Sequence, residues 1–126
     1  MSRFAIAAAA LALATPAFAE GMPKHVGECA TTKVLKVETR LVDGSGASVK
    51  GSGSAVEFAN GGYQVSYETV PAVEAARPGD AVTICLVSIP HPCPPGDKRG
   101  RVYKTTDERT KGAWSLPDAE HSCGGA

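Results

Sequence analysis

Beyond the first nineteen residues, apolar side chains are most concentrated in one stretch, residues 81–89, which is followed by a loop with four prolines. A strand places alternate side chains on opposite faces, and both faces of this stretch are largely apolar. Such a strand is normally buried on both sides. Turn residues precede it at 78–80, and the prolines from Pro90 to Pro95 end it because they lack the N–H that a sheet ladder needs. We therefore predict a central, doubly buried strand and a stiff loop after it.

Residues 32–42 alternate between apolar and charged side chains and predict a half-exposed strand. Its apolar face is built from odd-numbered residues, Leu35, Val37, Thr39 and Leu41. The next segment, 43–54, contains four glycines and four serines in twelve residues. This composition is typical of a flexible loop or a loose hairpin tip, and a tolerated linker is a plainer interpretation than a loop that contacts a ligand.

A hairpin is predicted where residues 55–59 and 63–69 flank Asn60-Gly61-Gly62, because glycine and asparagine adopt the backbone of tight turns. One face of this hairpin carries Tyr63, Val65 and Tyr67 on one strand and Val56 and Phe58 on the other. We expect the hairpin to supply the main aromatic packing.

The remaining segments are short. Residues 70–77 allow one helical turn, and residues 99–106 and 113–116 predict two further strands. Residues 20–28 and 117–126 show no periodicity, so we expect a loosely held arm and a tail. The pattern as a whole predicts an all-β fold, a small single-domain barrel or sandwich of five to six short strands that disulfides staple.

Residues 1–19 have the features of a secretory signal peptide. Arg3 is followed by an apolar run too short for a membrane span, and Ala17 and Ala19 are suitable for cleavage after residue 19. The expected organisation is a cleaved signal peptide at 1–19 and a single domain at 20–126. We therefore expect a periplasmic or secreted protein without a transmembrane segment.

All four cysteines, Cys29, Cys85, Cys93 and Cys123, lie in the exported part. An even number of cysteines in an oxidising compartment indicates disulfides. Three pairings are compatible with four cysteines. We prefer Cys29 with Cys85, which ties the first strand to the central one, and Cys93 with Cys123, which ties the tail to the proline loop.

A His-x-Cys pair occurs twice, as His91-Pro92-Cys93 and His121-Ser122-Cys123. Two imidazoles and two sulfurs are ligands that zinc or copper accept, so a metal site at His91 and His121, with His25 as a further candidate, is the alternative hypothesis. Disulfide formation competes with thiolate ligation. The main expectation is therefore no metal and no cofactor.

Catalytic patterns are weak in this sequence. The Gly-x-Ser-x-Gly elbow of serine hydrolases is absent, and paired cysteines leave no thiol for nucleophilic attack. Asp118, Glu120 and His121 form a candidate acid–base cluster, but they lie in the predicted tail. An enzyme is thus the least favoured class.

Residues 97–111 contain six basic and three acidic side chains, a local charge of about +3 in a chain whose net charge is zero. On a strand, Arg99, Arg101 and Tyr103 would share one face and could bind an anion. The candidate binding residues are Arg99, Arg101, Tyr103, Lys104 and Arg109. The plain alternative is a solvated strand face with acidic neighbours as counter-ions.

The function that these observations favour is a small exported binding protein, such as an inhibitor, an accessory subunit or an envelope adaptor. The proline loop and the basic, aromatic strand would form its binding surface. The expected partner is a protein or an anionic glycan or envelope component, and nothing in the overall charge favours nucleic acid. A periplasmic copper- or zinc-binding protein is the alternative.

Overall fold

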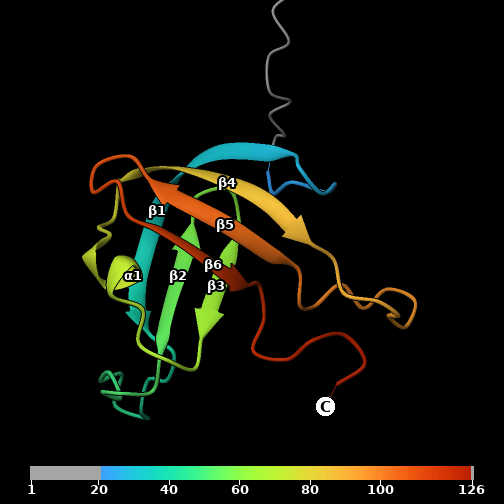
Figure 1. Ribbon diagram of the computed structural model, residues 1–126. Coiled ribbons are helices and arrows are strands. Elements are labelled where there is room, and N and C mark those ends of the chain that lie inside the picture. Colours follow the sequence, from blue (N-terminus) through green and yellow to red (C-terminus); the bar gives the residue numbers. More distant parts are fainter. Residues whose placement is uncertain (1–20, 126) are drawn as a thin grey trace, which may run out of the picture.

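The computed structural model describes residues 21–125, so the predicted signal peptide at 1–19 lies outside the described residues. The elements are β1 (Cys29–Thr39), β2 (Ser54–Phe58), β3 (Tyr63–Ser66), α1 (Pro71–Ala75), β4 (Ala81–Ser88), β5 (Val102–Asp107) and β6 (Ala113–Pro117). The strands form one antiparallel sheet in the order β3-β2-β1-β4-β5-β6. The sheet curls into a half-barrel (Figure 1). The predicted all-β class is confirmed, with one curled sheet instead of two stacked ones.

One hydrophobic core fills the concave side of this sheet. Its buried members come from every strand except β3, together with the helix region, and are Val34, Val56, Phe58, Val73, Ala76, Val82, Ile84, Leu86, Tyr103 and Trp114. The single turn of α1 begins with Pro71, whose fixed φ suits a first helical turn. It packs against β1, β2 and β6 and inserts Val73 into the core. The predicted helical turn is therefore confirmed.

Strand β4 is central, as predicted, but it is buried on one face only. Val82, Ile84 and Leu86 are at most 1% exposed, whereas Val87 is 47% exposed. Because the sheet curls around a single core, the other face of β4 lies on its convex, outer side. The prediction of a doubly buried strand was wrong because an apolar side chain can remain at the surface of a small domain.

A β-bulge changes the phase of β1. Val34 pairs with Phe58 and Lys36 pairs with Glu57, so Leu35 is the extra residue. Leu35 is consequently 59% exposed, while Val34 on the opposite face is buried. The prediction that Leu35 lies on the apolar face of this strand was therefore wrong. Val37, which follows the bulge, does pack against the core.

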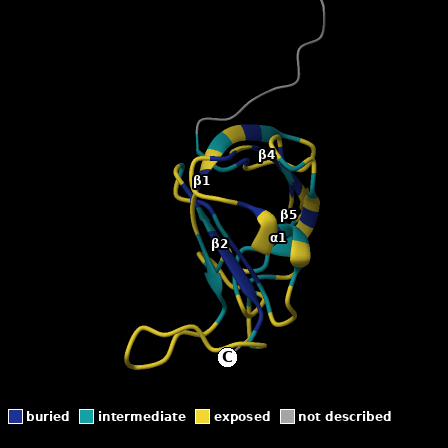
Figure 2. Ribbon diagram, turned by 90° about the vertical axis from the view of Figure 1, so that its left-hand side faces the viewer, coloured by how far each residue is buried: buried dark blue, intermediate teal, exposed yellow. Residues whose placement is uncertain are grey.

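The segment between β1 and β2 is a hairpin tip, exposed at every position from 41 to 51 (Figure 2). An isolated bridge joins Val42 to Ser48. The Asp43 carboxylate accepts hydrogen bonds from the backbone N–H of Ser45 and Ala47, both at 2.9 Å. The Ser45 hydroxyl donates to the same oxygen, and these contacts lower the pKa of Asp43.

The β2–β3 hairpin forms as predicted, but it does not supply the main aromatic packing. Phe58 is buried, whereas Tyr67 is 53% exposed and stacks on Arg40, with 4.3 Å between the guanidinium carbon and the ring centroid. The other core aromatics come from β5 and β6, as Tyr103 and Trp114. The inward side chain of β3 is instead polar: Gln64 is fully buried.

Gln64 connects the two edges of the half-barrel across the seam between β3 and β6. Its Nε2 donates to the carbonyl oxygens of Tyr103 (2.8 Å) and Leu116 (3.0 Å). Its Oε1 accepts from the Thr105 hydroxyl (2.6 Å) and the Trp114 indole N–H (2.8 Å). All four hydrogen-bonding positions of the amide are therefore used, and one side chain closes the seam where backbone pairing stops.

Both preferred disulfides are present. Cys29 and Cys85 lie opposite each other in the β1–β4 ladder, and their bond spans 56 residues of sequence. Cys93 and Cys123 join the proline loop to the C-terminal segment over 30 residues. The first disulfide therefore reinforces the sheet, and the second holds two irregular segments together.

Candidate functional site

Two adjoining surface cavities, of about 440 and 280 Å³, open where the β2–β3 turn approaches the segment before β5. They share Met22, Gly61, Lys98, Arg101 and Tyr103 in their walls. The larger cavity adds Lys24 from the N-terminal segment, and the smaller one adds Tyr63 and Asp118. Four segments that are distant in sequence thus meet at one site, which we call the basic cavity.

The N-terminal segment is fixed against the hairpin turn. Pro23 is fully buried, and the Tyr103 hydroxyl donates to its carbonyl oxygen at 3.5 Å. The Met22 side chain packs directly on the turn, because a Cβ at Gly62 would overlap its sulfur. The expectation of a loosely held arm was therefore wrong for this part, which forms one wall of the basic cavity.

Three cationic side chains line the basic cavity against one carboxylate. Lys24, Lys98 and Arg101 contribute the positive charges, and Asp118 contributes the negative one. Within residues 21–125, none of these three cations forms an ion pair within 4.0 Å, and the Nε of Arg101 is buried without a hydrogen bond. Because these cations have no ion-pair partner among the described residues, an anion that enters the cavity can pair with them.

The charges of the basic cavity act on its two titratable walls. Burial raises the pKa of Tyr103, and the Asp118 carboxylate adds to this rise, whereas the Arg101 guanidinium opposes it. Burial also raises the pKa of Asp118, while the backbone N–H groups of Gly100 and Arg101 and the positive charge of Arg101 lower it. Arg101 is thus close enough to act on both groups.

The structure brings two of the five predicted binding residues together. Arg101 and Tyr103 both line the basic cavity. Tyr103 is only 3% exposed, so it forms a wall and offers no open stacking surface. The basic Lys98, which belongs to the same charged segment, lines the cavity beside them.

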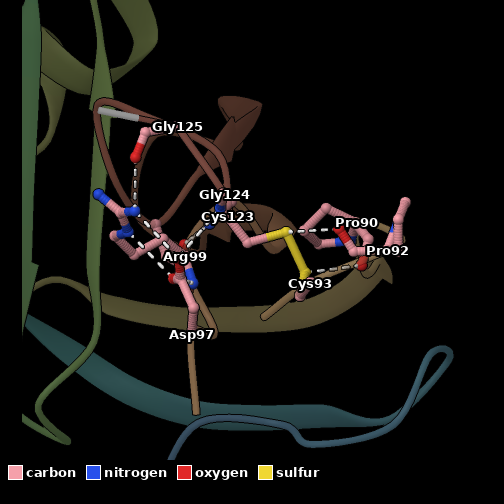
Figure 3. Close-up of a disulfide and its surroundings, with 10 residues drawn as sticks. Pro90, Pro92, Cys93, Asp97, Arg99, Cys123, Gly124 and Gly125 are labelled. Atoms are coloured by element: carbon pink, nitrogen blue, oxygen red, sulfur yellow. Dashed lines mark hydrogen bonds and ion pairs between the residues drawn. A yellow bond between two sulfur atoms is a disulfide. The ribbon is translucent and has the colours of Figure 1, made fainter. Parts of the chain in front are cut away.

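Arg99 does not join them, because β5 begins only at Val102 and Arg99 lies in the preceding loop. Its Nε and one terminal nitrogen donate to the two Asp97 oxygens at 3.0 and 2.9 Å, and the terminal nitrogen also donates to Gly125 O at 3.0 Å (Figure 3). These contacts hold the pKa of Asp97 well below its usual range. The predicted shared face of Arg99, Arg101 and Tyr103 is therefore absent.

The other two predicted residues also lie outside the basic cavity. Lys104 is exposed on the outer face of the sheet, opposite Cys85 and Ser115. Arg109 follows β5 and donates from Nε and a terminal nitrogen to Asp80, at 2.7 and 3.0 Å. Its guanidinium is thus already occupied by a carboxylate.

The C-terminal segment is bonded to the loop before β5, contrary to the expectation of an unheld tail. Asp118 accepts the Gly100 N–H at 2.8 Å, and the Cys123 N–H donates to Arg99 O at 2.8 Å. Glu120 pairs with Arg40 at 2.8 Å. Figure 3 shows the Cys93–Cys123 bond beside the Asp97–Arg99 pair. These bonds place Asp118 in the cavity wall.

The alternative metal ligands, His91 and His121, are both exposed, in the proline loop and the C-terminal segment. The sulfurs of Cys93 and Cys123 are bonded to each other and are not available as thiolates. His25 approaches Glu28 at 3.3 Å. In the described part of the chain, no group of three or more His, Cys, Asp or Glu side chains is arranged to hold a metal ion.

Sequence reasoning missed Met22 and Lys24 as parts of the site. The signal that could have indicated them is the apolar pair Met22-Pro23, because packing of this pair against the core would place the neighbouring Lys24 beside it. Asp118 was noticed, but as a member of a catalytic cluster.

Comparisons with models of protein families, with curated proteins and with solved structures find no match for this chain. Among residues 21–125, no helix is long and apolar enough to cross a membrane. The two disulfides are compatible with an extracellular protein.

Proposed function

We propose that this protein is a small exported, non-catalytic binding protein that captures an acidic group of its partner in the basic cavity. The observation that carries the proposal is the difference among the arginines of one segment. Arg99 and Arg109 are each bonded to an aspartate, whereas Arg101 lines the cavity and forms no ion pair with another described residue. A guanidinium in this state favours a carboxylate, sulfate or phosphate from outside.

The proline loop supports this role by fixing one side of the cavity. The Cys93–Cys123 bond and the Asp97–Arg99 pair bracket the residues that lead to Lys98. A cation whose backbone is fixed loses less conformational entropy on binding. The exposed prolines Pro92, Pro94 and Pro95 lie next to this anchor and are available to contact the body of a larger partner, as an inhibitor or adaptor requires.

Export is the second part of the proposal, and the signal-like segment and the two disulfides support it. Expression of the full chain in a bacterium, followed by sequencing of the product's N-terminus, tests it. We expect a product that begins at Glu20 and contains no free thiol. An uncleaved, cytoplasmic product would contradict export.

Binding is tested by retention on three immobilised polyanions: polyglutamate, a polyuronate and vesicles of phosphatidylglycerol. The variant Lys98→Gln/Arg101→Gln removes two charges from the cavity. A matched control, Lys33→Gln/Lys104→Gln, removes two charges from exposed positions in β1 and β5. We expect the wild type and the control to be retained on at least one surface. The apparent affinity of the cavity variant for that surface should be at least tenfold lower. Equal elution of both variants, or no retention of the wild type on any surface, would refute the proposal.

A further inference from the structure

We infer that the ligand of the basic cavity is an acidic saccharide, a sugar unit that carries a carboxylate together with several hydroxyl groups. The inference rests on the proposed function and specifies its ligand. It follows from the combination in one cavity of three cations, one carboxylate and a half-buried aromatic ring. Each of these groups matches a different part of such a sugar.

The carboxylate of the ligand matches the cationic side of the cavity. Arg101 and Lys98 line both lobes, and Lys24 lines the larger one. With Asp118 ionised, the four charged side chains sum to about +2, because three cations oppose one carboxylate. A ligand with a net negative charge is therefore favoured over a neutral or zwitterionic one.

Asp118 distinguishes a saccharide from a simple anion. It lies in the wall of the smaller lobe, and its position is set by hydrogen bonds to Gly100 N–H and from its own N–H to Arg101 O, at 2.8 and 3.0 Å. A carboxylate repels phosphate, sulfate or a second carboxylate, but it accepts hydrogen bonds from hydroxyl groups. A wall with both signs of charge therefore favours a ligand that has acidic and hydroxyl groups on neighbouring atoms.

The shape of the cavity agrees with a compact ring. The two adjoining lobes, about 440 and 280 Å³, are in the range of small-molecule sites. Tyr63 is half-buried in the smaller lobe, so part of its ring can contact the C–H face of a sugar. Gly61 leaves the turn open, since nothing lies within 4 Å of the place where its Cβ would be. An acidic peptide lacks the ring hydroxyl groups that Asp118 could accept hydrogen bonds from, and we disfavour it.

The test is isothermal titration calorimetry of the folded, disulfide-bonded protein with four probes. The first is a disaccharide that contains glucuronate, and the second is the same disaccharide with glucose in place of glucuronate. The others are the dipeptide Glu-Glu and inorganic phosphate. We expect the glucuronate disaccharide to bind at least tenfold more tightly than each of the other three.

Two variants identify the groups responsible. Arg101→Gln should weaken glucuronate binding at least tenfold. Asp118→Asn keeps an oxygen that accepts from Gly100 N–H but removes the negative charge that repels anions. It should strengthen phosphate binding severalfold and reduce the difference in affinity between the glucuronate disaccharide and phosphate. Lys104→Gln, on the outer face, is the matched control and should change neither affinity.

The outcomes separate this inference from the proposed function. Arg101-dependent binding of Glu-Glu or phosphate, equal to or tighter than that of the sugar, would overturn the acidic saccharide and leave a basic cavity that captures another anion. Equal binding of the glucose and glucuronate disaccharides would also overturn it. No binding of any probe, together with no retention on the three polyanions, would refute the proposed function itself.

Discussion

Two buried polar groups of the half-barrel, Gln64 at the seam and Arg101 at the basic cavity, differ in how their hydrogen-bonding capacity is used. The amide of Gln64 makes four hydrogen bonds to β5 and β6. The Nε of Arg101, only two residues before Tyr103, makes none among the described residues. The hydrogen-bonding capacity of Gln64 is therefore fully used within the protein, whereas that of the Arg101 guanidinium is not.

This difference separates polar groups that stabilise the fold from those available for binding. A satisfied buried network contributes to stability and to a unique register, whereas an unsatisfied donor lowers stability. Positive charge alone does not make the distinction, since Arg99 and Arg109 carry the same charge as Arg101 but are bonded to Asp97 and Asp80. The availability of the guanidinium decides which arginine can bind.

The largest effect is expected at the seam. Gln64→Leu leaves an indole N–H and a hydroxyl without partners in the core and removes a second hydrogen bond from two carbonyl groups of the β5–β6 ladder, and it should lower the free energy of unfolding by about 4 kcal/mol. Chemical denaturation measures this loss. Thr105→Val and Trp114→Phe each remove one donor and should cost about 1 kcal/mol, apart from the packing change. A loss below 1 kcal/mol for Gln64→Leu would show that the seam does not depend on this amide.

The second effect separates the two disulfides. Cys93→Ser/Cys123→Ser should lower the free energy of unfolding by about 2 kcal/mol. This is less than the loss of chain entropy alone would give for a disulfide of this loop length, because Asp118 and Arg99 keep part of the C-terminal segment in place. Ligand affinity should fall severalfold, since Lys98 and Asp118 lose their anchor. Cys29→Ala/Cys85→Ala should instead reduce stability and leave affinity intact at a temperature where the protein is folded. The opposite pattern, measured by denaturation and calorimetry, would contradict the assignment of the site.

A smaller change in stability is expected at Arg101 itself. Arg101→Met preserves the length of the side chain and removes the donor that has no acceptor, so the free energy of unfolding should change by less than about 1 kcal/mol, while anion binding is lost. Thermal unfolding and calorimetry on the same sample give both quantities. A strong destabilisation would mean that Arg101 has a structural role similar to that of Gln64.

The smallest effect concerns the carboxyl pair beside Arg109. Arg109 and the neighbouring Asp107 carboxyl hold the pKa of Asp80 below its usual range, whereas burial and Asp80 raise the pKa of Asp107. A raised pKa favours the protonated acid in the folded state. The contribution of Asp107 to stability is therefore complete below the unfolded pKa of about 4 and is lost as the pH rises through the folded pKa. Asp80 contributes in the opposite direction, above pH 4.

Asp107→Asn imitates the protonated acid and should remove this loss. In thermal unfolding, we expect the melting temperature of the variant to exceed that of the wild type by a few degrees at pH 7. Near pH 3 the two melting temperatures should be equal. Asp43→Asn is a matched control at an exposed carboxylate with a lowered pKa, and it should be slightly destabilising at pH 7. A lower melting temperature for Asp107→Asn at pH 7 would contradict the raised pKa.

Local turn and strand chemistry made much of the fold predictable. The Asn60-Gly61-Gly62 turn, the strand at 81–88 and the pairing of Cys29 with Cys85 all depend on residues close in sequence or on the order of the strands. The bulge at Leu35 was not predictable, because alternation in sequence continues across it while the pairing shifts by one residue. The seam was also missed, since an isolated glutamine gives no sign that four distant groups will surround it.

The candidate site was predictable only in part for a similar reason. The pattern of basic residues indicated the segment of which Lys98, Arg101 and Tyr103 line the cavity. The sequence did not show that Asp97 would occupy Arg99, or that Asp80, 29 residues before Arg109, would occupy that guanidinium. Counter-ion choice depends on tertiary contacts, so it cannot be obtained from charge patterns alone.

We propose that the ligand binds in the basic cavity. Titration of isotope-labelled protein with the glucuronate disaccharide, followed by amide chemical-shift changes, tests this location most directly. We predict that the shifts cluster in residues 21, 22, 24, 60–63, 98–103 and 118, and that Arg101→Gln abolishes them. Shifts centred on the outer face around Lys104, or around Arg109 and Asp80, would contradict the account.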